Sequence, residues 1–245
     1  MPMVRTNCLT NFFSWIGWTN IKNGGAHSVL VVALVFFAIG TVLIAAMYDD
    51  ELKLLTIMAI FTVIYLACGN WRKTKHFFLA FLFGGVCENV AVMFGIWNYS
   101  HAHYLPVPLW LPFGWGLAVV FLDEILPSRV QNKPHFSWKA ILAALAGTFL
   151  LGIVFTNELL TTFAFVAATI FFFLSGKYGK DEVSAGSGAA VLCTVTESVN
   201  ILAGNWHYTV AVFGTPLWLP LCWFNAFLIM RRIIHSDLRA IYSTY

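Results

Sequence analysis

The sequence predicts an all-α, polytopic membrane protein with eight transmembrane helices, built as two parallel repeats of four. Hydrophobic residues make up 60% of the 245 residues and charged residues only 10%, whereas soluble domains carry about 25% charged residues. Apolar runs recur along the whole chain at a length that crosses a bilayer. A long motif also occurs twice, and this predicts the internal repeat.

Eight apolar runs define the expected helices. They cover residues 27–48, 54–69, 76–97, 107–126, 138–155, 159–174, 186–206 and 216–230. Residues 1–26 are rich in aromatic residues, as in "NFFSWIGW", so we predict a retained interfacial segment there and not a cleaved signal peptide. The expected units are a first repeat over 27–133, a second repeat over 134–234 and a cytoplasmic tail over 235–245.

The distribution of Lys and Arg predicts the orientation of the helices. With both termini in the cytoplasm, all 14 Lys and Arg residues except Lys53 fall in the inner segments, as the positive-inside rule requires. A single missed helix would exchange the sides of every later loop. We therefore predict an integral, multi-pass protein with both termini cytoplasmic.

The repeated motif reads "CENVAVMFGIWNYSHAHYLPVPLWLPFGW" in the first half and "TESVNILAGNWHYTVAVFGTPLWLPLCW" in the second. The alignment pairs Glu88 with Glu197, Gly95 with Gly204, Trp97 with Trp206, Tyr99 with Tyr208 and Trp115 with Trp223, and Glu51 matches Glu158 further upstream. Because four is an even number of helices, the two copies share one orientation about a pseudo-twofold axis along the membrane normal. The third and seventh helices are expected to face each other across that axis.

Glu88 and Glu197 each interrupt an apolar run and are the predicted catalytic residues. Each precedes a tryptophan by nine residues, about 13 Å along a helix, which places both carboxyls near the middle of the bilayer. A charge at that depth costs at least about 2.5 kcal/mol, so such residues usually mark a site or a path. If the two carboxyls converge, they could serve as general acid and base. Alternatively, each bonds a neighbouring helix through Asn89, Ser198 or Asn200.

Aromatic and amide side chains near these acids are the predicted substrate-binding residues: Asn89, Trp97, Tyr99, Trp115, Asn200, Trp206, Tyr208 and Trp223. Trp115 and Trp223 follow a proline and lie deeper, where an indole face could stabilise a cation. For Trp97 and Trp206, near the expected helix ends, an aromatic belt at the membrane interface is the alternative.

Other polar residues suggest no further site. His101, His103 and His207 could meet near one surface, but solvated loop histidines are commoner, and we predict no metal and no cofactor. Asp123 and Glu124 are expected at the membrane interface. The five cysteines form no CxxC pair and indicate no disulfide framework. A net charge of +3 without a basic cluster excludes a nucleic-acid surface.

The pattern of Glu88, Gly95, Trp97, Tyr99 and the prolines before Trp115 resembles small integral-membrane enzymes of carotenoid and isoprenoid metabolism. These are the carotenoid hydratases and the related small lycopene cyclases, and the resemblance covers about a third of the chain. It implies that a protonated carboxyl, Glu88 or Glu197, gives its proton to an isoprenoid double bond while aromatic faces shelter the carbocation. The proline–acid–acid motif expected of a lycopene cyclase does not occur here.

Three functions follow as hypotheses. The leading one is a cofactor-independent enzyme of the hydratase, cyclase or isomerase type that acts on an isoprenoid or other lipid, with a homodimer as the oligomer considered. The second is a proton-coupled transporter of a small solute or a lipid, in which the same carboxylates load and release protons. The third is a noncatalytic lipid-binding membrane protein, in which the acids fix helix packing.

Overall fold

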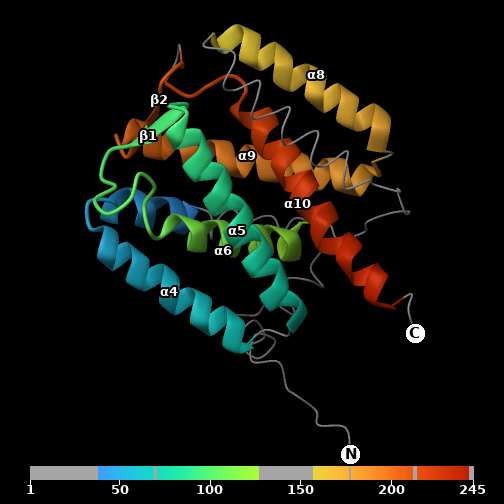
Figure 1. The fold of residues 1–245 in the computed structure, drawn as a ribbon, viewed down its shortest axis with the longest axis horizontal. Coiled ribbons are helices and arrows are strands. Elements are labelled where there is room, and N and C mark those ends of the chain that lie inside the picture. The colour runs from blue at the N-terminus through green and yellow to red at the C-terminus, as the bar shows by residue number, and fades with distance from the viewer. Residues whose placement is uncertain (1–37, 69–70, 127–156, 177, 212–213, 243–245) are drawn as a thin grey trace, which may run out of the picture.

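The computed structural model describes residues 38–68, 71–126, 157–176, 178–211 and 214–242, and the description below is confined to them (Figure 1). The expected interfacial segment over 1–26 and the fifth expected helix over 138–155 lie outside these residues. Where the chain is described, it is mostly helical with one short two-stranded sheet.

Each described helix overlaps one of the expected ranges, although several ends differ. The helices are Ala38–Met47, α4 (Glu51–Cys68), α5 (Trp71–Met93), α6 (Leu111–Ile125), α8 (Glu158–Gly176), α9 (Lys180–Leu202) and α10 (Leu219–Tyr242). Two stretches, Thr74–Met93 in α5 and Lys180–Leu202 in α9, are long and apolar enough to cross a membrane, and several others are apolar but shorter. The prediction of an apolar helical chain therefore agrees with the structure.

The expected ends of the third and seventh helices are wrong. α5 ends at Met93 and α9 at Leu202, and each is followed by a glycine with positive φ, 67° at Gly95 and 79° at Gly204. Glycine adopts this conformation without steric cost and ends helices in this way. The N–H of Ile96 then bonds the carbonyl of Ala91, and the N–H of Asn205 bonds that of Asn200.

The chain turns back after each glycine into a strand that a purely helical prediction does not contain. β1 (Trp97–Tyr99) and β2 (Trp206–Tyr208) pair antiparallel, with Trp97 opposite Tyr208 and Tyr99 opposite Trp206. Successive side chains of a strand point to opposite faces. The tryptophan and tyrosine of each strand therefore share one face, and the sheet ties the two halves of the chain together at one end of the helices (Figure 1).

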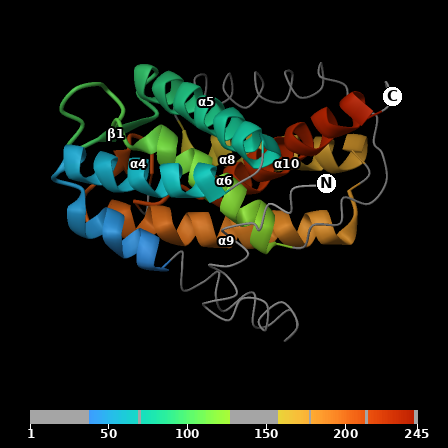
Figure 2. The same cartoon turned by 90° about the horizontal axis from the view of Figure 1, so that it is seen from below.

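Helix packing differs from the expected facing of the third and seventh helices. α5 packs along α6, and α9 packs along α10. Between the halves, α10 contacts α5 and α6, and α6 lies between α4 and α9 (Figure 2). Leu122 of α6 and Leu126, directly after α6, share one core cluster with Ala185 and Ala189 of α9. Leu126 also lies next to Gly188 of α9. These small residues leave room for the leucines, so the end of α6 packs against α9.

α10 continues to Tyr242, beyond the expected end of the last helix at residue 230 and into the expected tail. Hydropathy falls at "RRIIHSDLRAIY", but no proline or glycine interrupts the helix. Arg231, expected in an inner loop, is 1% exposed, and its Nε lies 3.2 Å from Oδ1 of Asp123. Asp123 is therefore half of an ion pair between α6 and α10, a contact that the sequence did not predict. Its position at the membrane interface stays a prediction.

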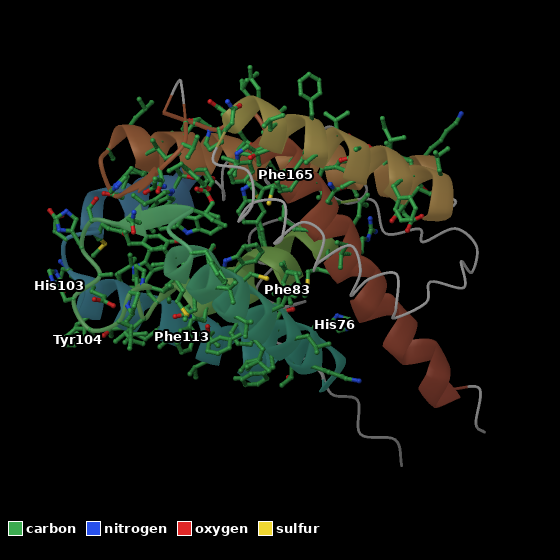
Figure 3. The ribbon with its side chains drawn as sticks, turned by 45° about the horizontal axis from the view of Figure 1, so that its top comes forward. His76, Phe83, His103, Tyr104, Phe113 and Phe165 are labelled. Carbon is green, nitrogen blue, oxygen red and sulfur yellow. The ribbon has the colours of Figure 1, made fainter. Side chains whose placement is uncertain are left out.

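The two ends of the helical body carry different loops. Figure 3 shows His103 and Tyr104 together at the end that holds the sheet, and His76 at the other end, near the start of α5. The loop 100–110 connects β1 to α6 at the sheet end. The predicted catalytic and aromatic residues are therefore gathered by elements that meet at the sheet end.

Candidate functional site

Glu88, on the last third of α5, is 6% exposed and accepts three hydrogen bonds. The indole Nε1 of Trp97 donates to Oε2 at 2.9 Å, and the hydroxyl of Tyr99 donates to the same oxygen at 2.6 Å. The Nε1 of Trp115 donates to Oε1 at 2.9 Å. An indole N–H can only donate, so both oxygens of Glu88 act as acceptors.

Glu197, the counterpart of Glu88 on α9, accepts fewer hydrogen bonds. Trp206 Nε1 donates to its Oε2 at 2.7 Å, and the Tyr208 hydroxyl lies 3.3 Å from the same oxygen. Its Oε1 accepts no hydrogen bond from any described residue. Glu197 is also partly exposed, unlike Glu88. The carboxyls do not bond each other, but Glu88 is close enough for its charge to act on Glu197.

The turn at each glycine explains these bonds. The sequence interpretation placed Trp97 about 13 Å along a continuous helix from Glu88 and gave an aromatic belt as the alternative for Trp97 and Trp206; that spacing and that alternative are wrong. Because the chain reverses at Gly95 and Gly204, each tryptophan returns to the carboxylate nine residues before it. The placement of both carboxyls near the middle of the bilayer depended on that spacing and therefore loses its support.

The tyrosines of the two strands remain neutral donors. Burial, followed by the charge of Glu88, raises the pKa of Tyr99 well above its ordinary value. Burial and then the charge of Glu197 raise the pKa of Tyr208 in the same way. Each phenol therefore keeps its proton and donates a hydrogen bond to the neighbouring carboxyl group.

The aromatic rings of the two halves pair with one another. Trp97 lies against Tyr208 with ring centroids 5.3 Å apart, and Tyr99 lies against Trp206 at 5.7 Å. Trp115 and Trp223 are stacked, with centroids 4.7 Å apart and an interplanar angle of 26°. The structure thus brings all six predicted aromatic residues together. Cross-strand aromatic pairs of this kind stabilise a sheet by roughly 0.2–1 kcal/mol each.

The two predicted asparagines serve the helices and not this site. Asn89 Nδ2 donates to the carbonyl of Gly85, and Asn200 Nδ2 donates to that of Thr196, each one turn earlier on the same helix. The Ser198 hydroxyl likewise bonds the carbonyl of Thr194. The alternative in which Glu88 and Glu197 bond through these side chains is therefore wrong; their partners are aromatic donors.

Two further buried acids were not among the predicted site residues. Glu51, 3% exposed at the start of α4, accepts the N–H of Leu109 at 2.7 Å and the N–H of His103 at 2.9 Å. Glu158, 3% exposed at the start of α8, accepts the N–H of Leu217 at 2.7 Å. The bonds to Leu109 and Leu217 each hold the residue after the first proline of a "PLWLP" motif. The matched positions of Glu51 and Glu158 in the two repeats were the signal by which the sequence could have revealed these acids.

The loop histidines His101 and His103 contact acids other than Glu88 and Glu197. His101 Nε2 lies 3.2 Å from Oδ1 of Asp49, and the rings of His101 and His103 have centroids 6.3 Å apart. The described residues contain no group of three or more His, Cys, Asp or Glu side chains that could hold a metal ion. The described part of the site thus consists of carboxylates, indoles and phenols.

Such a site offers fixed hydrogen-bond acceptors among apolar rings. Three hydrogen bonds to its two oxygens hold the carboxyl of Glu88 in one orientation. The open oxygen of Glu197 can accept a hydrogen bond from another molecule, and the adjacent rings can contact its apolar part. The arrangement therefore suits an amphiphilic molecule with a small polar group.

Comparison with known proteins gives a likeness of fold. No protein family and no curated protein matches the chain. Two crystal structures of MvINS, an Insig homolog from Mycobacterium vanbaalenii, do resemble it. One has a TM-score of 0.54 at 18% identity; the other, a cross-linked trimer, has 0.53 at 19%, and each match covers 66% of this chain and 91% of MvINS. Neither structure is a carotenoid hydratase or cyclase. The shared fold is that of a polytopic membrane protein, and with the two apolar helices it indicates that this chain is a membrane protein.

Proposed function

We propose that this chain is a multi-pass membrane protein that binds a lipid at the sheet end and does not transform it. The observation that carries the proposal is that both oxygens of Glu88 are held by three aromatic donors within 2.9 Å, whereas one oxygen of Glu197 is open. A carboxyl held in this way organises a binding site. It is poorly placed to exchange a proton with a substrate, because transfer would break bonds to indoles that can only donate.

Large apolar side chains on the outer helix faces support the membrane setting. Exposed examples are Ile60, Phe61, Val63 and Ile64 on α4, Phe163, Phe171 and Leu174 on α8, and Val191 and Val195 on α9. Apolar surface of this extent is rare on soluble monomers. The proposal includes eight membrane spans with both termini in the cytoplasm, because Lys and Arg then fall almost entirely in the inner segments. Homodimerisation stays a prediction from the sequence.

We also propose that the fold is a four-helix unit present twice. Supporting this, α4, α5, β1 and α6 make the same mutual contacts as α8, α9, β2 and α10. Positions 108 residues apart in α6 and α10 meet each other: Trp115 stacks on Trp223, and Asp123 pairs with Arg231. Self-pairing of equivalent positions is what a twofold axis between α6 and α10 produces.

The ion pair gives a test of this axis. Reversing one charge, Asp123→Arg, would place two cations together in a buried position, and we expect it to lower the unfolding free energy by about 3–5 kcal/mol. The exchanged pair, Asp123→Arg with Arg231→Asp, should recover most of this loss, since a twofold axis makes the two positions equivalent. Unfolding in detergent with increasing sodium dodecyl sulfate would measure both. A double variant as unstable as the single one would contradict the axis.

Lipid binding can be tested on the intact chain. The protein is purified in a mild detergent, its organic extract is analysed by mass spectrometry, and an unrelated membrane protein from the same host serves as control. We expect one lipid class at roughly one molecule per chain, chemically unchanged after prolonged incubation. An extract no different from that of the control protein would overturn the proposal.

An acid–base enzyme acting on an isoprenoid or other lipid is the second candidate. The observation that favours it is the open Oε1 of Glu197, beside the charge of Glu88. In this case the unmodified protein would convert the co-purified lipid with time, and Glu197→Gln would abolish the conversion. If the lipid stays unchanged in the unmodified protein and in Glu197→Gln, binding alone is favoured. Proton-coupled transport stays a prediction from the sequence.

A further inference from the structure

The two halves of the site differ at one bond. In the first half, Trp115 Nε1 donates to Glu88 Oε1. In the second half, the equivalent tryptophan does not reach its acid: Trp223 Nε1 is buried and has no hydrogen-bond partner among the described residues. The matching acceptor, Glu197 Oε1, also receives no donor there. The bond that closes the site around Glu88 is therefore missing around Glu197.

The ring of Trp223 is nevertheless fixed in place. It stacks on Trp115 at 4.7 Å and packs against Phe227 and Phe224 of α10. Trp223 and Tyr208, whose hydroxyl donates to Glu197, pack against the same cluster of Phe165, Trp218 and Leu219. Leaving a buried N–H without a partner costs roughly 1–3 kcal/mol. A fixed, unpaired donor and an open acceptor thus occur in the same part of the second half.

We propose that Trp223 Nε1 and Glu197 Oε1 together bind the free hydroxyl of a neutral lipid. This rests on the proposed function and names the head group that the site selects. A hydroxyl accepts a hydrogen bond from the indole and donates one to the carboxylate, so it satisfies both. An ester or ether oxygen can only accept, and an ammonium group can only donate.

The two acids of the site also limit which lipid head groups can bind. Glu88 and Glu197 are both acids, and the structure gives neither a cationic partner among its described residues. A phosphate would bring a negative charge beside two acids in a poorly solvated site, which electrostatic repulsion and desolvation disfavour. An uncharged lipid alcohol therefore fits the site better than an anionic phospholipid.

The test uses geranylgeraniol and its methyl ether, which share the apolar chain and differ in the hydroxyl proton. Each compound is added to the intact protein in detergent, and the amount retained after washing is measured by mass spectrometry. We expect about tenfold stronger binding of the alcohol, the size of one hydrogen bond. Trp223→Phe and Glu197→Gln should each remove this preference. Trp110→Phe is the control for the loss of an indole, because its Nε1 is also buried and unpaired among the described residues, and its ring packs in the cluster of Trp206 and not in those of Trp223.

The outcomes separate this inference from the function on which it rests. Loss of the preference in Trp223→Phe, together with its retention in Trp110→Phe, supports the site, because both variants lose an unpaired indole N–H and the same ring atoms. Equal retention of the two compounds by the unmodified protein, including retention of neither, overturns it. So does a preference that survives in Trp223→Phe, even when the organic extract shows a bound lipid. Absence of any co-purified lipid instead counts against the proposed function.

Discussion

Replacing Glu88 with alanine is expected to destabilise the protein by about 3–6 kcal/mol, at roughly 1–2 kcal/mol for each buried donor left without its acceptor. Three donors lose their partner at once: the indoles of Trp97 and Trp115 and the phenol of Tyr99. Because Trp97 and Tyr99 belong to β1, the loss should also loosen the sheet that joins the halves.

Glu197→Ala is the matched control for this substitution. Glu197 holds two donors, one of them at 3.3 Å, and is less buried, so its loss should cost roughly half as much. Unfolding by sodium dodecyl sulfate in mixed micelles, followed by tryptophan fluorescence, measures both. Equal effects of the two substitutions would mean that the difference in hydrogen bonding between the halves carries no energetic weight.

The second large effect is expected at Gly84, one turn before Glu88 on α5. A methyl group added there would overlap the ring of Trp115, whose Cβ, Cγ and Cδ2 are its nearest neighbours. Overpacking of this kind costs about 1–3 kcal/mol. In Gly84→Ala the displaced ring would also lose its bond to Glu88 and its stacking on Trp223. We expect a total loss of about 2–5 kcal/mol.

Gly85→Ala, on the same helix and one position later, is the control for helix propensity. Its methyl group would lie 3.4 Å from Pro112 Cγ, an ordinary contact. Alanine favours a helix by about 1 kcal/mol over glycine, so Gly85→Ala should be neutral or stabilising. The melting temperatures of the two variants in detergent check this. A Gly84→Ala protein as stable as Gly85→Ala would show that Trp115 is not held where the structure has it.

Sequence reasoning found the residues of the site better than their arrangement. Glu88, Glu197 and the six aromatic residues were identified because identical Trp, Tyr and Glu recur in two apolar runs. The period-two spacing in "WNY" and "WHY", directly after a glycine, was the signal for a strand, but three residues are too short for periodicity to distinguish a strand from a helix end. Trp97 and Trp206 were therefore placed near the helix ends, about 13 Å along the helix from the acids.

The buried contacts between distant segments could not be predicted from the sequence. Asp123 and Arg231 were each interpreted alone, as interfacial and as a loop residue, because nothing in the chain states that α6 and α10 cross. In the sequence, Glu51 and Glu158 stood out only as matching positions of the repeat. Their hydrogen bonds to the "PLWLP" segments can be seen only once the loops are folded.

The sequence alone determined the apolar helical composition, the helix positions in the described residues and the set of acids and aromatic rings, since these depend on local hydropathy and on repeated letters. Only the tertiary structure decided that the aromatic donors turn back onto the acids, that α6 and α10 meet between the halves, and that Glu88 is closed while Glu197 is open. These depend on two glycine turns and on side chains more than a hundred residues apart, and local patterns carry no information about which distant groups meet.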